Sequence, residues 1–170
     1  MPNNSTQSTD HQTIFEFTEF FLGRTRAWGI FEDRFGRLRR RISVEMHGSW
    51  REQIFVLEEL FAYDTGATEK RTWLVEPLGT GRFKATCPDC VGVALGRCDS
   101  DSIVMSYQFR LALSTRVIVV RFDDRIYRTG DGIAINRATM SKWGVKLGEL
   151  SLFFHRVAEQ DQESGTVVQA

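Results

Sequence analysis

The sequence predicts an all-β protein, an antiparallel barrel or sandwich of about eight to ten strands. Apolar and polar residues alternate from residue 36 onward, with the period of strands that bury one face. The alternating segments are short and are separated by turn sequences such as DTGAT (64–68) and RTGDG (128–132). Only one long segment has a helical pattern instead, so helices are expected to be a minor part of the fold.

The elements follow in order along the chain. The segment TIFEFTEFFLG (13–23) predicts a helix that ends at Gly23 and whose phenylalanines plug one end of a barrel. A second, short helix is expected within ATMSKWG (138–144). The expected strands lie within residues 36–46, 55–63, 71–75, 82–87, 91–97, 103–113, 116–127, 133–140 and 145–154.

Composition limits the classes of function. The 170 residues fit one domain, expected over 14–156, with polar tails at 1–13 and 157–170 expected to be flexible. Lys plus Arg and Asp plus Glu both number 22, which gives no reason to expect a nucleic-acid partner. Neither a signal peptide nor a membrane span is recognisable, so we expect a cytoplasmic protein with mostly reduced thiols. The oligomeric state is left open.

All three cysteines fall within TCPDCVGVALGRC (86–98). A structural zinc site needs four ligands, and neither Cys98 nor any histidine is spaced to complete the Cys87–Cys90 pair. A thioredoxin-like pair needs a following helix, whereas an alternating strand with two glycines follows Cys90. We therefore predict a turn at CPDC, no metal and no cofactor.

Two charged residues share the apolar phase of their strands. Glu59 alternates with Phe55, Leu57 and Phe61, and Arg71 alternates with Trp73 and Val75. The DTGAT hairpin places both on the same face as a near-diagonal pair, and inward charges are costly unless they are paired. We predict that Glu59 and Arg71 contact each other directly or through water, either as a structural ion pair or as the polar floor of an apolar pocket.

A second polar cluster lies in FDDRIY (122–127) and NRATMSK (136–142). Asp123 and Asp124 differ in phase, so one is expected to face inward and the other outward, and the same holds for Asn136 and Arg137. Paired carboxylates can serve acid–base chemistry or hold a cation, although no known calcium-loop or zinc-ligand spacing is present. The alternative is that these residues form turns at the rim of the barrel, with a salt link from Asp123 or Asp124 to Arg137 or Lys142.

Six stretches together resemble an uncharacterised bacterial family, domain of unknown function 3833: RAWGIFEDRFG, LEELFAYDTG, RTW, PDCVGVALG, VRFDDRIY and NRATMSKWGV. The resemblance runs from about Phe20 to Phe154 and implies a lipocalin-like (calycin-type) β-barrel with no established activity. Many relatives begin with a lipoprotein signal, which we do not expect here, and relatives carry an apolar residue where this chain has Cys90. The family's recurring polar positions match Glu59, Arg71, Asp89, Asp123, Asp124, Asn136, Arg137 and Lys142, and the aromatic ones match Trp28, Trp73, Tyr107 and Tyr127.

Three functions remain open. The first is a barrel that binds a small apolar or amphipathic molecule through Glu59, Arg71, Trp73, Tyr107, Asp123, Asp124, Tyr127, Asn136, Arg137 and Lys142. The second is a barrel enzyme, an isomerase or hydrolase, with Glu59 or an aspartate as base and Arg71 as electrostatic stabiliser. The third is a structural or partner-binding module whose barrel is filled with side chains.

Overall fold

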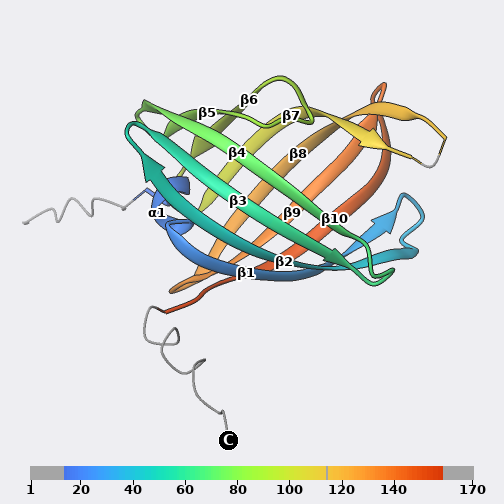
Figure 1. Ribbon diagram of the computed structural model, residues 1–170, viewed down its shortest axis with the longest axis horizontal. Helices are drawn as coiled ribbons and strands as arrows, with labels where there is room; N and C mark the ends of the chain where they lie inside the picture. The colour runs from blue at the N-terminus through green and yellow to red at the C-terminus, as the bar shows by residue number, and fades with distance from the viewer. Residues whose placement is uncertain (1–13, 114, 159–170) are drawn as a thin grey trace, which may run out of the picture.

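Ten antiparallel strands close into one barrel in the computed structural model, which describes residues 14–113 and 115–158 (Figure 1). Each strand pairs with the next in sequence, and β1 pairs with β10, so the sheet has no free edge. The predicted all-β barrel is confirmed. The strands are β1 (Gly23–Asp33), β2 (Leu38–Arg51), β3 (Ile54–Tyr63), β4 (Thr68–Gly79), β5 (Arg82–Thr86), β6 (Cys90–Cys98), β7 (Ser102–Ala112), β8 (Val117–Gly130), β9 (Ile133–Lys142) and β10 (Val145–Arg156).

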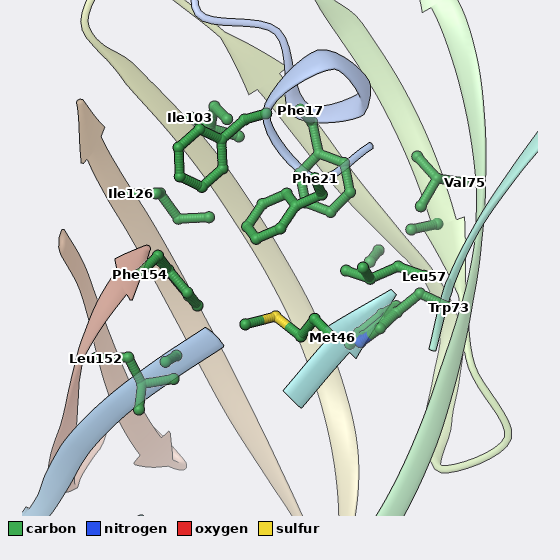
Figure 2. Packing of buried hydrophobic residues seen from close by; sticks show 14 of the residues in the cluster. Phe17, Phe21, Met46, Leu57, Trp73, Val75, Ile103, Ile126, Leu152 and Phe154 are labelled. Atoms are coloured by element: carbon green, nitrogen blue, oxygen red, sulfur yellow. The ribbon is translucent and has the colours of Figure 1, made fainter. Parts of the chain in front are cut away.

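The short helix α1 (Phe17–Phe20) lies at one end of the barrel, here called the helix end (Figure 1). Phe17 and Phe21 point from it into the interior, toward Met46 and Phe154 (Figure 2). The phenylalanine plug that the sequence predicted is therefore present, although the helix itself is four residues long rather than spanning 13–23. After Phe21 the chain extends into a bridge with Gly48 of β2 and then into β1, which ends the helix early.

Gly48 allows this close approach. A side chain at this position would collide with the Phe21 carbonyl oxygen and with the ring of Phe55. The hydrogen atom of glycine is thus what lets the plug segment lie directly on β2.

Two expectations about the elements were wrong. Residues 23–33 form β1, although no strand was expected there. Several of its inward positions hold small residues, including Thr25, Ala27 and Gly29, so the apolar alternation that marks a strand is weak. Residues 138–144 form the end of β9 and a two-residue turn rather than a helix, because β9 is paired on both sides, with β8 and β10. Sheet pairing here overrides the helix propensity of Ala138 and Met140.

The barrel interior is a continuous apolar core. Inward residues of most strands match the predicted phases, as in β2, where Ile42, Val44 and Met46 are buried. In β6 the small residue Ala94 faces inward while Val93 and Leu95 are exposed, and the ring of Phe83 lies over Gly96. Large aromatic rings from other elements fill the space that these small residues leave.

The opposite end, here called the loop end, carries the β1–β2, β3–β4, β5–β6, β7–β8 and β9–β10 turns (Figure 1). No helix in the described part of the chain is long and apolar enough to cross a membrane.

Candidate functional site

A cavity of about 70 Å³ lies inside the barrel between the plug and the middle of the strands. It contains six of the residues that the sequence singled out, brought together from β3, β4, β7, β8 and β9. These six are Glu59, Arg71, Trp73, Tyr107, Asp124 and Asn136. Apolar side chains make up most of the remaining wall, including Phe17 and Phe21 of the plug.

Glu59 and Arg71 are direct cross-strand partners in the β3–β4 register, closer than the predicted diagonal. Of the two forms of the predicted contact, the direct one is wrong, because Arg71 donates a 2.7 Å hydrogen bond to Glu69 instead, whereas a contact through water stays a prediction. Glu69 also accepts a hydrogen bond from the hydroxyl of Tyr63. The sequence contained this signal, because Glu69 lies two residues before Arg71 on one strand and so on the same face.

The Arg71 guanidinium is held between two aromatic rings. Its central carbon lies 4.7 Å from the ring centroid of Phe61 and 4.4 Å from that of Phe109. Phe61 follows Glu59 along β3, whereas Phe109 is on β7, so Arg71 links two separate parts of the wall. On their strands, Phe61 and Phe109 lie two residues nearer the loop end than Glu59 and Tyr107, and both Arg71 and Phe61 line the cavity. Such stacking stabilises a cation that is mostly removed from water.

Glu59 accepts a hydrogen bond from the indole of Trp73, with 3.1 Å between Nε1 and Oε2. Burial raises the pKa of the Glu59 carboxyl, and the positive charge of Arg71 and the Trp73 hydrogen bond only partly oppose this effect. Trp73 also packs edge-on against Tyr107, with 5.1 Å between the ring centroids. Glu59 is thus a carboxyl on an apolar wall with one of its oxygens held in place.

Asp124 lines the cavity from β8 and accepts a 3.3 Å hydrogen bond from the hydroxyl of Tyr107. Burial raises the pKa of Asp124 to about 7, despite the hydrogen bond from Tyr107, which acts in the opposite direction. Burial likewise raises the pKa of Tyr107 well above its usual value. Asp124 therefore changes its charge near neutral pH, unlike an ordinary aspartate.

Three polar atoms on the cavity wall are buried without a hydrogen-bond partner among the described residues. They are Nε of Arg71, Oδ1 of Asp124 and Oδ1 of Asn136. Leaving such an atom unpaired costs about 1–3 kcal/mol, and buried groups in folded proteins are nearly always paired. The cavity has room for several water molecules or for a polar group that would pair with these atoms.

The other four predicted site residues lie outside the cavity. Asp123 faces outward, as the strand phase predicted for one of the two aspartates, and binds Arg121 and Ser106. Arg137 pairs with Glu149 across β9 and β10, Lys142 donates to the carbonyl oxygen of Val119, and Tyr127 is 40% exposed. The predicted salt link from an aspartate to Arg137 or Lys142 is therefore wrong, because Asp123 pairs with Arg121 on its own strand, Arg137 pairs with Glu149, and Lys142 has no carboxylate within 4.0 Å among the described residues.

The CPDC segment forms the predicted turn, with a hydrogen bond from the Cys90 amide to the Cys87 carbonyl. The two sulfur atoms lie 2.7 Å apart, and Cys98 is buried at the far end of β6. The hydrogen bond from Cys90 lowers the pKa of Cys87, with Arg71 contributing in the same direction, and raises the pKa of Cys90. In the described part of the chain no three His, Cys, Asp or Glu side chains gather as metal ligands would.

The family comparison decides the identity of the chain. A family model described as "Protein of unknown function (DUF3833)" matches residues 2–156. The chain belongs to this family. A comparison with curated proteins finds no significant match.

Among solved structures, the DUF3833 barrel is similar to the S-type phycobiliprotein lyase from Guillardia theta, with a TM-score of 0.61 and 10% sequence identity. The similarity covers 84% of this chain and 92% of the lyase chain. At this identity the likeness describes the fold alone, and it agrees with the lipocalin-like barrel that the sequence predicted.

Proposed function

We propose that the DUF3833 barrel binds a small amphipathic molecule in its interior. The observation that carries the proposal is the group of three unpaired polar atoms, on Arg71, Asp124 and Asn136, on the wall of one mostly apolar cavity. An apolar pocket with a few convergent polar groups is the usual form of a small-molecule site.

The polar atoms define the chemistry of the ligand. Nε of Arg71 donates a hydrogen bond, and the oxygens of Asp124 and Asn136 accept one. A hydroxyl, a protonated carboxyl or an amide both donates and accepts, so each of these groups matches the wall. The fully anionic head of a sulfate or phosphate would instead face the Glu59 and Asp124 carboxyls, which disfavours it.

The cavity volume limits how the ligand is bound. About 70 Å³ fits the polar end of a molecule, whereas drug-sized ligands occupy pockets of roughly 300–1,000 Å³. A longer apolar body would have to displace Phe17 and Phe21, the side chains that separate the cavity from the helix end. The plug is carried by a four-residue helix with one backbone bridge to β2, which favours movement there over movement of the barrel wall.

Native mass spectrometry of the purified protein tests the proposal. The wild-type protein is expected to carry a small molecule that denaturation releases. Asn136→Leu, which replaces an inward amide with an apolar group of similar size, should lose it, and Arg137→Leu, the outward neighbour on β9, should retain it. If nothing co-purifies, the three proteins are titrated with medium-chain alcohols and carboxylic acids, and failure of the wild-type protein to bind any of them would favour the filled-barrel alternative.

An enzymatic role is the second candidate, and one observation favours it. Asp124 has a pKa of about 7 and faces the cavity, which suits a general base or acid at neutral pH. An isomerase would use Asp124 or Glu59 to move a proton on a ligand whose oxygen is held by Arg71. Deuterium exchange into a co-purified ligand in heavy water, present in the wild-type protein and absent in Asp124→Asn, distinguishes this role from binding alone.

A further inference from the structure

We propose that the loop end of the barrel docks on membranes that contain anionic phospholipids. This surface is separate from the interior cavity and does not depend on the proposed ligand. It is formed by the tips of the β1–β2 and β9–β10 turns, here called the tip cluster and defined as Arg34, Phe35, Arg37, Lys142 and Trp143.

The tip cluster exposes the two aromatic side chains with the least burial among the described residues. Trp143 is 91% exposed and Phe35 is 69% exposed. The two turns that carry them lie at the end of the barrel away from α1 (Figure 1), and neither side chain belongs to the core. Exposed tryptophan and phenylalanine beside cations are the side chains that partition into the interface of a bilayer.

The two tips belong to hairpins that are adjacent in the barrel and lie at the same end of it. β1 and β10 are paired up to Asp33 and Gly148, and the Arg34 amide then donates a 2.9 Å hydrogen bond to the Leu147 carbonyl. This bond holds the start of the β1–β2 turn against β10, four residues after Trp143. Val145 beside Trp143 is also 52% exposed, which extends the apolar surface of the tip.

The backbone at Trp143 argues that the tryptophan is there for a reason other than folding. Trp143 and Gly144 are the central residues of a two-residue hairpin turn, with φ angles of 52° and 77°. Such a turn prefers Asn-Gly or Gly-Gly, because positive φ is unfavourable for a bulky side chain. A strained, exposed tryptophan contributes little to stability, which points to a role in contact with another surface.

The charge around the rings is complementary to an anionic surface. The Arg34 and Arg37 guanidiniums lie 4.7 and 5.9 Å from the centroid of Phe35, and the Lys142 ammonium lies 4.6 Å from that of Trp143. Across residues 14–113 and 115–158, no carboxylate lies within 4.0 Å of these three cations. The neighbouring carboxylate of Asp33 is already paired with Arg39.

The chain has no net charge, so this excess of cations is local. The helix end has no such excess, because its acidic residues Glu16, Glu19, Glu52, Asp99, Asp101 and Asp131 are matched by Arg24, Arg51, Arg82, Arg97, Arg128 and Arg156. A lipid surface satisfies both features of the tip cluster, since it offers headgroup charge to the cations and an apolar layer to the rings.

Vesicle binding of the full chain tests the proposal. Flotation with vesicles of phosphatidylglycerol and phosphatidylcholine should recover the protein, whereas vesicles of phosphatidylcholine alone should recover much less. Binding should weaken as salt rises, and replacing Arg37 or Lys142 by Gln should lower the affinity about fivefold each. Tryptophan emission should shift to shorter wavelength on binding as Trp143 leaves water.

Two variants with matched controls separate docking from folding. Trp143→Asn places a residue suited to positive φ in the turn, so it should unfold at the same or a higher temperature while binding anionic vesicles at least about tenfold less tightly. Phe35→Ser should also weaken binding. Leu95→Ser removes a side chain of similar exposure, 64%, from the barrel wall and should leave binding unchanged.

Equal binding of wild-type protein and Trp143→Asn would overturn the proposal, as would a wild-type protein that ignores anionic vesicles. If Trp143→Asn instead abolishes self-association while vesicles have no effect, the tip cluster is a contact between copies of this chain and the membrane assignment is wrong.

Discussion

Replacing Asp124 by Asn should change how the stability of the barrel depends on pH. Burial raises the Asp124 pKa from an ordinary 3.8 to about 7, so the folded state holds this proton more tightly than the unfolded state does. The stabilising contribution is therefore complete below the unfolded pKa of about 4 and is lost as pH rises through 7. The asparagine side chain does not titrate, so this part of the pH dependence should disappear in Asp124→Asn.

The magnitude follows from the size of the shift. About three pKa units at about 1.4 kcal/mol per unit correspond to roughly 4 kcal/mol. Relative to wild type, Asp124→Asn should therefore gain roughly 3–4 kcal/mol between pH 4 and pH 8. The hydrogen bond from Tyr107 survives, because an asparagine oxygen also accepts it.

Urea unfolding followed by circular dichroism at a series of pH values measures this difference. Asp123→Asn is the matched control, because Asp123 is the adjacent residue, faces outward and has a pKa lowered by its hydrogen bond with Arg121. Its contribution has the opposite sign, since it is present above the unfolded pKa and is lost as pH falls. Its side chain is 43% exposed, so the effect should stay below about 1 kcal/mol. Parallel pH profiles for wild type and Asp124→Asn would falsify the argument that this carboxyl is buried and protonated.

Three further changes test other parts of the fold. Gly48→Ala should destabilise the barrel by more than about 2 kcal/mol, because the added methyl group would collide with the plug segment. Gly130→Ala is the control and should be nearly neutral, because no atom lies closer than 4.0 Å to the added methyl group. Thermal unfolding of the two variants measures the difference. Cys87 has a lowered pKa, whereas burial raises the pKa of Cys98 to about 12, so Cys87 should react with iodoacetamide first. Peptide mass spectrometry that finds the reverse order would contradict this. Arg71→Ala should lower the free energy of unfolding by roughly 2–4 kcal/mol. Arg71→Met should recover part of that loss, because it keeps an unbranched stem between the rings of Phe61 and Phe109. Equal losses for the two variants in urea unfolding would mean that the stem contributes nothing.

The sequence predicted the parts of this protein that follow from local pattern. Strand alternation gave the barrel and most of the inward positions, including Glu59 and Arg71, because successive side chains of a strand point to opposite faces; for Asp123 and Asp124 it predicted only that one faces inward. The turn residues of CPDC placed the hairpin between β5 and β6. The pattern failed where inward residues are small, as at Ala27 in β1, because small side chains leave little apolar period to detect.

Partnerships between strands were decided only in three dimensions. Arg71 was predicted to contact Glu59 directly or through water. It binds Glu69 directly instead, and it stacks on Phe109, a residue 38 positions away that reaches it only because the barrel closes. The raised pKa of Asp124 likewise depends on the walls around it rather than on its neighbours in sequence. Alternation fixes which face a side chain occupies, whereas register and closure determine what it meets there, and those depend on the packing of all ten strands at once.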